Sequence, residues 1–189
     1  MKIIFFGTPE AAVPFLEALS TKAVGVVTQP DKPGKRGQEI QKSPVKIAAE
    51  KQGIPVFQPA DLKDPAFASR IAESKADAGI VVAYGKILPP AVISAFPKGI
   101  YNIHFSLLPE LRGAAPIQWA ILRGFKKTGV CAFKIAESLD TGEIFSRREV
   151  EISETDDAVS LEKKLIPLGV ETLEETLQAL QSGRKTGEP

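Results

Sequence analysis

The chain has 189 residues, of which 43% are hydrophobic and 25% are charged. This composition is typical of a soluble globular domain, and it excludes collagen-like, coiled-coil and disordered chains. Its 24 Lys and Arg residues nearly balance its 23 Asp and Glu residues, so a nucleic acid or a membrane could bind only at a local patch of charge.

Strands and helices are predicted to alternate along the first half of the chain. Strands are predicted over 1–6, 23–28, 54–57, 77–83 and 99–105, and helices over 10–19, 44–52 and 64–74. The strands are short apolar runs, as in sheets that are covered on both faces, and the helices begin at Ser, Thr, Asp or Pro residues. This alternation predicts right-handed βαβ units, and therefore an α/β fold with a doubly wound, mostly parallel sheet and helices on both faces.

The second half begins with a predicted helix over 116–122. Strands over 129–135 and 143–150 then follow one another closely, so an antiparallel edge is expected. A long amphipathic helix is predicted over 158–180, with an apolar stripe that packs on the sheet: Val159, Leu161, Leu165, Leu168, Leu173, Leu177 and Leu180. Residues 1–181 are therefore predicted to form one domain, and 182–189 the start of a linker.

The inventory of reactive residues is small. Cys131 is the single cysteine, so no internal disulfide is expected, and one Cys with one His is too few for an ordinary zinc site. We therefore expect no metal. No apolar run reaches the roughly 20 residues of a membrane-spanning helix, and we expect a cytoplasmic protein.

An amide and an imidazole side chain share one face of the predicted strand 99–105. Asn102 and His104 are two residues apart, at the end of a strand where open α/β sheets bind their ligands. One interpretation is a hydrogen-bonded core histidine. A functional role is favoured because His104 is the only His, lies beside Asn102 and precedes the turn formed by Ser106-Leu107-Leu108-Pro109.

A second candidate catalytic residue is Asp140, which Thr141 and Gly142 follow. The alternative interpretation is a structural role, in which the carboxylate accepts a hydrogen bond from the nearby backbone and stabilises a turn. Near His104, the carboxylate would instead fix the imidazole tautomer, as a general base requires. No G-x-S-x-G nucleophile elbow occurs in the chain, and the first predicted strand is not followed by a glycine-rich phosphate loop.

Four motifs resemble the catalytic domain of the folate-dependent formyltransferases, and among these the members that act on methionyl-tRNA. They are Asn102-Ile103-His104, Ser106-Leu107-Leu108-Pro109, Arg112 to Ile117, and Leu139 to Gly142. Because Phe6 to Glu10 and Val82 to Gly85 match as well, the resemblance covers nearly the whole chain.

The resemblance implies a Rossmann-like fold and a formyl transfer from 10-formyltetrahydrofolate, as cosubstrate, to the amino group of initiator methionyl-tRNA. It also implies that Asn102, His104 and Asp140 are catalytic and that Ser106, Leu107, Leu108 and Pro109 line the folate site. Such enzymes need no metal, and a cytoplasmic monomer is expected. The family usually continues into a C-terminal β-barrel domain, which this sequence is expected to lack.

The segment 29–46 is a local concentration of positive charge. It carries Lys32, Lys35, Arg36, Lys42 and Lys46 against Asp31 and Glu39, a net charge of +3. One interpretation is a solvated loop. The other is that Lys35, Arg36 and Lys42 contact the phosphates of tRNA.

Two alternative functions remain open. One is a formyltransferase that acts on a nucleotide sugar or another small amine, and the other is a folate-binding domain with weak or no catalysis.

Overall fold

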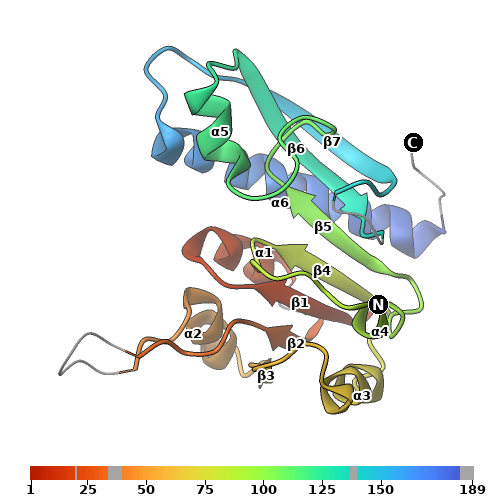
Figure 1. Cartoon of the computed structure of the whole chain (residues 1–189). Helices are drawn as coiled ribbons and strands as arrows, with labels where there is room; N and C mark the ends of the chain where they lie inside the picture. Colours follow the sequence, from red (N-terminus) through yellow and green to blue (C-terminus); the bar gives the residue numbers. More distant parts are fainter. Residues whose placement is uncertain (20, 34–39, 137–139, 184–189) are drawn as a thin grey trace. The chain divides into compact units, whose positions relative to one another are not determined.

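The computed structural model describes residues 1–19, 21–33, 40–136 and 140–183. The chain forms two compact units, Met1–Ile100 and Tyr101–Pro189. Each unit has its own strands and helices, labelled along the chain in Figure 1.

The first unit contains a parallel sheet, as predicted. Its strands are β1 (Ile3–Gly7), β2 (Ala23–Val27), β3 (Val56–Phe57) and β4 (Ala78–Val82), in the order β3-β2-β1-β4. Every residue of β1 and of β4 is buried, which explains why both read as unbroken apolar runs rather than as alternating ones.

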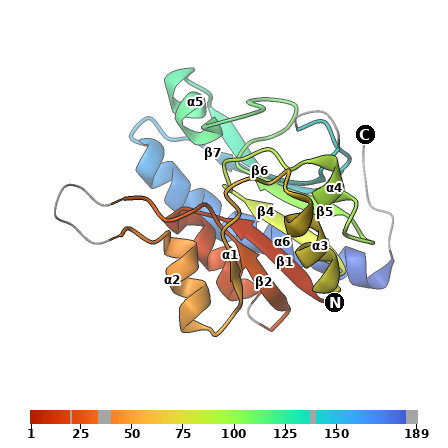
Figure 2. The same cartoon turned by 60° about the horizontal axis from the view of Figure 1, so that its bottom comes forward.

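Helices cover both sides of this sheet. The helical segments are η1 (Glu10–Ala12), α1 (Val13–Ala18), α2 (Pro44–Lys51), α3 (Pro65–Glu73) and α4 (Pro90–Ile93). Figure 2 shows α1 and α2 on one side of the strands and α3 and α4 on the other. Caps fix where two of these helices begin, because Ser43 accepts a hydrogen bond from Lys46 N and Asp64 accepts one from Ala66 N.

Two details differ from the sequence prediction. The helix predicted over 10–19 begins as a 3-10 turn, because Pro14 has no N–H to donate to Glu10 and an α-helical first turn would lack that bond. The short helix α4 was not predicted, since its four residues are too few to show a period.

The second unit has antiparallel strands, which confirms the expected antiparallel edge. Its strands are β5 (Ile100–His104), β6 (Lys127–Lys134) and β7 (Ile144–Glu151), with β6 between the other two. Helix α5 (Pro116–Leu122) has the predicted bounds. It packs on α6 (Ala158–Ser182), which in turn packs on β6 and β7.

Helix α6 begins at a capping box, in which Asp157 and Ser160 exchange side-chain and backbone hydrogen bonds. Most of the predicted apolar stripe is buried: Leu161, Leu165, Leu173, Leu177 and Leu180. Val159 is a correction, because it lies in the first turn and is 61% exposed; Leu168 is only half-buried. The helix ends at Ser182, two residues later than predicted, where Gly183 takes a left-handed conformation.

No helix in the described ranges has both the length and the hydropathy to cross a bilayer.

Tyr84 is a buried polar residue of the first unit. Its ring packs edge-on against Phe6 with centroids 5.8 Å apart, and its backbone carbonyl accepts hydrogen bonds from Thr8 Oγ1 and Gln29 Nε2. Its phenol hydroxyl is buried and has no hydrogen-bond partner within the described part of the chain. Burial raises the pKa of this hydroxyl from 10.0 to about 12.

We expect Tyr84→Phe to change stability in a pH-dependent way. Below pH 9 the variant should be as stable as the wild type or more stable by about 1 kcal/mol, because it removes an unpaired buried hydroxyl. The phenol pKa is higher in the folded than in the unfolded state, so the wild type should lose stability relative to the variant between about pH 10 and 12. Denaturant unfolding of both proteins from pH 7 to 12 measures this difference. Parallel stability curves over that range would contradict the assignment.

Candidate active site

His104 is the last residue of β5 and is 7% exposed. Its Nε2 lies 3.0 Å from the carbonyl oxygen of Leu111. Because a carbonyl oxygen only accepts, Nε2 carries the proton, and in the neutral ring Nδ1 then has the free lone pair. The ring edge packs against Phe133, with centroids 6.4 Å apart.

Asn102 lies two residues before His104 on the same face of β5, so the two side chains leave the strand about 7 Å apart. Asn102 is half-buried and lies opposite Phe133 of β6, while His104 lies opposite Cys131. The structure therefore places an amide and an imidazole side by side at the end of a strand.

Asp140 is 9% exposed, and its Oδ2 accepts a hydrogen bond of 2.7 Å from the backbone N–H of Gly113. The backbone of Asp140 is left-handed, with φ of 50°, a conformation that Asp tolerates better than most residues. Gly142 fits close to β6, because a Cβ at this position would collide with the backbone oxygen of Lys134. The carboxylate thus bonds a segment far away in sequence.

One segment connects His104 and Asp140. His104 bonds the carbonyl of Leu111, and Asp140 bonds the N–H of Gly113 two residues later. The segment has left-handed backbone at Leu111, Gly113 and Ala115, with φ of 55°, 86° and 57°. At the two residues that are not glycine this conformation costs about 1–3 kcal/mol each, so the surrounding hydrogen bonds must hold it.

The turn of Ser106 to Pro109 follows β5 directly. The Ser106 hydroxyl is buried and donates to the backbone oxygen of Glu110 at 2.6 Å. Leu108 packs in the core against Cys131 and Phe133. Only Leu107, which is half-buried, and Pro109, which is exposed, have side chains that a ligand could reach without rearrangement. The assignment of this turn to a folate site stays a prediction.

Ion pairs neutralise part of the basic segment 29–46. Lys42 Nζ lies 2.8 Å from Glu50 Oε2, and this pairing raises the pKa of Lys42. Lys46 Nζ lies 2.6 Å from Asp31 Oδ2. Lys46 and Asp31 each also bond the Gln58 amide, so these bonds join the segment to the residue that follows β3. Two other predicted tRNA contacts, Lys35 and Arg36, lie outside the described residues.

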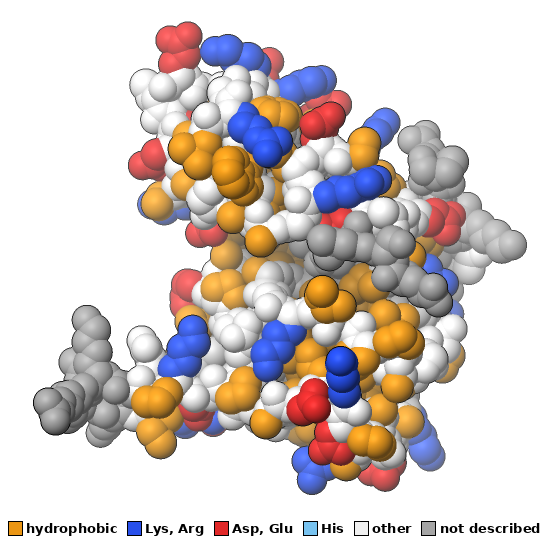
Figure 3. Space-filling view, viewed as in Figure 1, with side chains coloured by type: hydrophobic (Ala, Val, Ile, Leu, Met, Phe, Trp, Pro, Cys, Tyr) orange, Lys and Arg blue, Asp and Glu red, His pale blue; other side chains and the backbone are white. Residues whose placement is uncertain are grey.

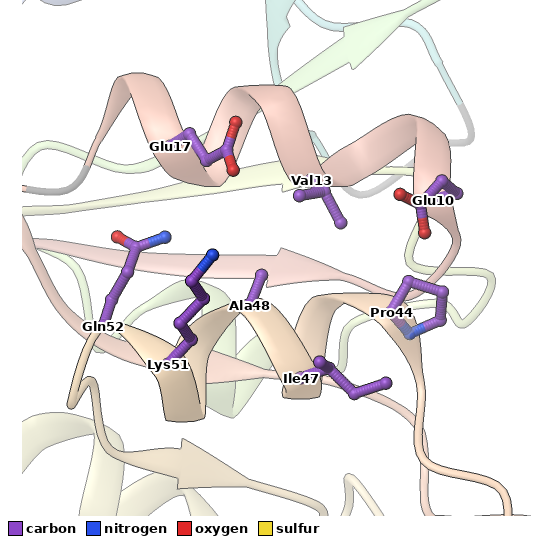
Figure 4. Close-up of a pocket in the computed structure, with 8 residues that line it drawn as sticks. All are labelled: Glu10, Val13, Glu17, Pro44, Ile47, Ala48, Lys51 and Gln52. Carbon is purple, nitrogen blue, oxygen red and sulfur yellow. The ribbon is translucent and has the colours of Figure 1, made fainter.

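A separate cavity of about 610 Å³ lies between η1 and α1 on one side and α2 on the other (Figure 4). It is lined by Glu10, Val13, Glu17, Pro44, Ile47, Ala48, Lys51 and Gln52, none of which is a predicted site residue. Among the described residues, no group of three or more His, Cys, Asp or Glu side chains is placed to hold a metal ion.

Comparison with known proteins decides the family. Residues 1–177 match the family model described as formyl transferase. The chain belongs to the formyl transferase family. The expected resemblance to formyltransferases is thereby confirmed.

Two curated relatives of this formyl transferase chain are named methionyl-tRNA formyltransferase. The protein from Sulfurihydrogenibium sp. is 48% identical over 100% of the chain and 62% of its own length. The protein from Clostridioides difficile is 44% identical over 97% of the chain and 60% of its own length. The chain thus spans about three-fifths of the relatives that it matches.

A solved structure establishes the fold of this formyl transferase chain. The phosphoribosylglycinamide formyltransferase of Bacillus halodurans has a TM-score of 0.80 and covers 96% of both chains at 24% identity. The predicted fold class, a doubly wound and mostly parallel α/β sheet with helices, is confirmed.

No role was assigned from the sequence to Leu111 or Gly113 of this formyl transferase chain, although Gly113 lies in the motif Arg112 to Ile117. Both form their hydrogen bonds through backbone groups, so their residue types do not indicate these bonds. The one available signal was Gly113 itself, since glycine allows the left-handed backbone that is seen there.

Proposed function

We propose that this chain supplies the site at which a formyl group passes from 10-formyltetrahydrofolate to the amino group of initiator methionyl-tRNA. The observation that carries this proposal is the 44–48% identity to methionyl-tRNA formyltransferases along nearly the whole chain. Asn102, His104 and Asp140 support it, because their side chains include the polar groups that such a transfer needs. The product would serve translation initiation in the cytoplasm, and we propose a monomer.

The first step is attack by the neutral amine of the methionyl group on the formyl carbon of the donor. A new C–N bond forms, and the formyl oxygen becomes a tetrahedral oxyanion. The Asn102 amide N–H, at the half-buried end of β5, donates a hydrogen bond to that oxygen.

The second step needs a proton to move. The attacking nitrogen becomes an ammonium, and His104 takes its proton through Nδ1, since Nε2–H is held by the Leu111 carbonyl. The imidazolium then gives a proton to the leaving nitrogen of the folate as the C–N bond to it breaks. Asp140 supplies a negative charge near the same backbone segment and stabilises the imidazolium between the two proton transfers.

The two substrates are assigned to different parts of the chain. In our proposal the folate lies against the turn that contains Leu107 and Pro109, whose side chains a ligand can reach. The tRNA phosphates bind the basic segment through Lys35 and Arg36, and the exposed Lys32 adds a further positive charge to this segment. Lys42 contributes less than its charge suggests, because Glu50 neutralises it.

The test of this function is a formylation assay with three acceptors. The protein is supplied with 10-formyltetrahydrofolate and offered methionyl-tRNA, a nucleotide-linked amino sugar or glycinamide ribonucleotide. We expect kcat/KM for methionyl-tRNA to exceed the values for the small amines by at least about 10³-fold. Equal or better use of a small amine would overturn the proposal, and donor binding without transfer to any acceptor would favour a binding domain.

Asn102→Ala should lower kcat about 10²- to 10³-fold, which is the effect of removing one oxyanion donor. Asn102→Asp is the matched variant, because it keeps the shape but places a carboxylate where negative charge develops, and it should be at least as slow. The KM for the folate should change little in both variants. An Asn102→Ala enzyme within about threefold of wild type would remove Asn102 from the mechanism.

A further inference from the structure

Helix α5 presents an unpartnered face to solvent in the second unit. Its inner residues Ile117 and Ala120 are buried, and the helix packs on α6. On its outer face Trp119 is 46% exposed and Leu122 is 74% exposed. The spacing of three between these residues places both on one side of the helix, next to the exposed Arg123.

Trp119 and Arg123 form a stacked pair. The guanidinium carbon of Arg123 lies 5.1 Å from the centroid of the Trp119 ring, a cation–π arrangement. Figure 3 shows hydrophobic and basic side chains lying side by side over α5, at the upper left of the view. An exposed indole with a guanidinium beside it offers a flat stacking surface and a positive charge together.

The sequence around α5 is strongly biased in charge. From Leu111 to Ala136 it contains no Asp or Glu but has five basic residues: Arg112, Arg123, Lys126, Lys127 and Lys134. Lys127 is paired with Glu149 at 2.8 Å, while Arg123 and the exposed Lys126 lie directly after α5. In a chain with a net charge of only +1, this is a local patch that fits a polyanion.

We propose that the α5 surface, defined by Trp119, Leu122, Arg123 and Lys126, binds the single-stranded 3′ end of an RNA. The inference rests on the proposed function, for which it names a second contact with the acceptor. Bases stack on Trp119 and Leu122, and Arg123 and Lys126 contact the phosphates. This combination of an aromatic platform with adjacent cations is typical of binding to single-stranded nucleic acid.

The position of α5 suits this role. The segment that bonds His104 and Asp140 ends where α5 begins, at Pro116. Trp119 therefore lies at most about 22 Å of backbone from Leu111, a distance that a few nucleotides can span. A strand that stacks on Trp119 can present its terminal amino acid to His104.

The chain supplies its own probe, since Trp119 is the single tryptophan. A short single-stranded RNA is titrated into the protein while Trp119 fluorescence is recorded at several salt concentrations. We expect quenching that saturates and an affinity that falls as salt rises. A heparin fragment of equal charge is the control, and it should bind with little quenching because it has no bases to stack.

Variants then separate stacking from charge, with affinity measured by the anisotropy of a labelled RNA. Trp119→Leu should weaken binding about 5- to 150-fold, which corresponds to the loss of one stacked base, and Trp119→Phe should restore most of it. Arg123→Ala should weaken binding and reduce the salt slope by about one. Lys163→Ala removes an exposed cation from α6 and should have no effect, which makes it the matched control.

The results of these experiments test RNA binding by the α5 surface separately from formyl transfer. Quenching of Trp119 by RNA, together with weaker RNA binding by Trp119→Leu in the anisotropy measurement, supports the surface even if methionyl-tRNA is not formylated. Normal formylation with an unchanged tRNA KM in Trp119→Leu would overturn the surface and leave the function standing. Equal quenching by heparin, equal effects of Arg123→Ala and Lys163→Ala, or no quenching at all would also overturn it.

Discussion

Replacing His104 by alanine should reduce formyl transfer to methionyl-tRNA by about 10²- to 10⁴-fold, while folate binding changes little. His104 is the only histidine, and it lies on the same strand face as Asn102. In the proposed reaction, attack and departure both depend on one proton that moves between two nitrogens, and a positioned general base contributes on this scale. The loss should therefore fall on kcat rather than on either KM.

His104→Gln is the structural control for this experiment. A glutamine amide can donate to the Leu111 carbonyl, as Nε2–H does, but it cannot take up a proton at neutral pH. We expect this variant to be as inactive as His104→Ala and more stable, because the carbonyl of the half-buried Leu111 keeps a donor. Single-turnover rates and urea unfolding measure the two effects separately.

The same pair of variants decides between a catalytic and a core histidine. If His104→Ala unfolds while His104→Gln is both folded and active, the imidazole serves only to satisfy the Leu111 carbonyl. In that case the mechanism proposed here is wrong.

The sequence predicted those parts of the fold that follow from local pattern. The buried runs Ile3–Gly7 and Ala78–Val82 were recognisable because burial on both faces leaves no polar alternation. Helix α5 was placed within its correct bounds, since Pro116 fixes the beginning and Gly124 follows the end. The pairing of Asn102 with His104 followed from the two-residue period of a strand.

Long-range contacts were not predictable in this way. Nothing in the order of residues shows that Glu50 neutralises Lys42, or that Asp31 and Gln58 enclose Lys46. The exposure of Val159 depends on how the first turn of α6 meets the sheet. These features are decided by tertiary packing, which a periodic pattern does not contain.

The candidate site illustrates the same limit. Its side chains are proposed from the sequence, but the hydrogen bonds of His104 and Asp140 involve backbone groups of Leu111 and Gly113. The left-handed conformations of Leu111 and Ala115 are unfavourable for residues with a Cβ, so local preference gives no indication of them at these two positions. The exposed basic and aromatic residues of α5 were not identified from the sequence. The apolar pattern of a short amphipathic helix indicates its buried face but not a role for its exposed face.

Asp140→Asn should be nearly as stable as the wild type and yet lose about 10²- to 10⁴-fold in kcat. Asparagine tolerates the left-handed backbone at this position, with φ of 50°, and its Oδ1 can still accept the bond from Gly113 N–H. In the proposed mechanism, the variant loses the negative charge that stabilises the protonated His104 between the two proton transfers. A positioned general base contributes about 10²- to 10⁴-fold, and this range sets the loss expected when its protonated form is no longer stabilised.

Asp140→Ala separates the charge from the hydrogen bond. It removes the charge, leaves the half-buried Gly113 N–H without its acceptor, and places a Cβ without a polar group in a left-handed turn. We expect the same loss of activity and, in addition, a loss of about 1–3 kcal/mol in unfolding free energy. If Asp140→Asn retained activity and Asp140→Ala lost both activity and stability, the carboxylate would act only by holding the segment that bonds His104. Asp140 would then be a positioning residue, and the charge on the imidazolium would have to be balanced by the substrates.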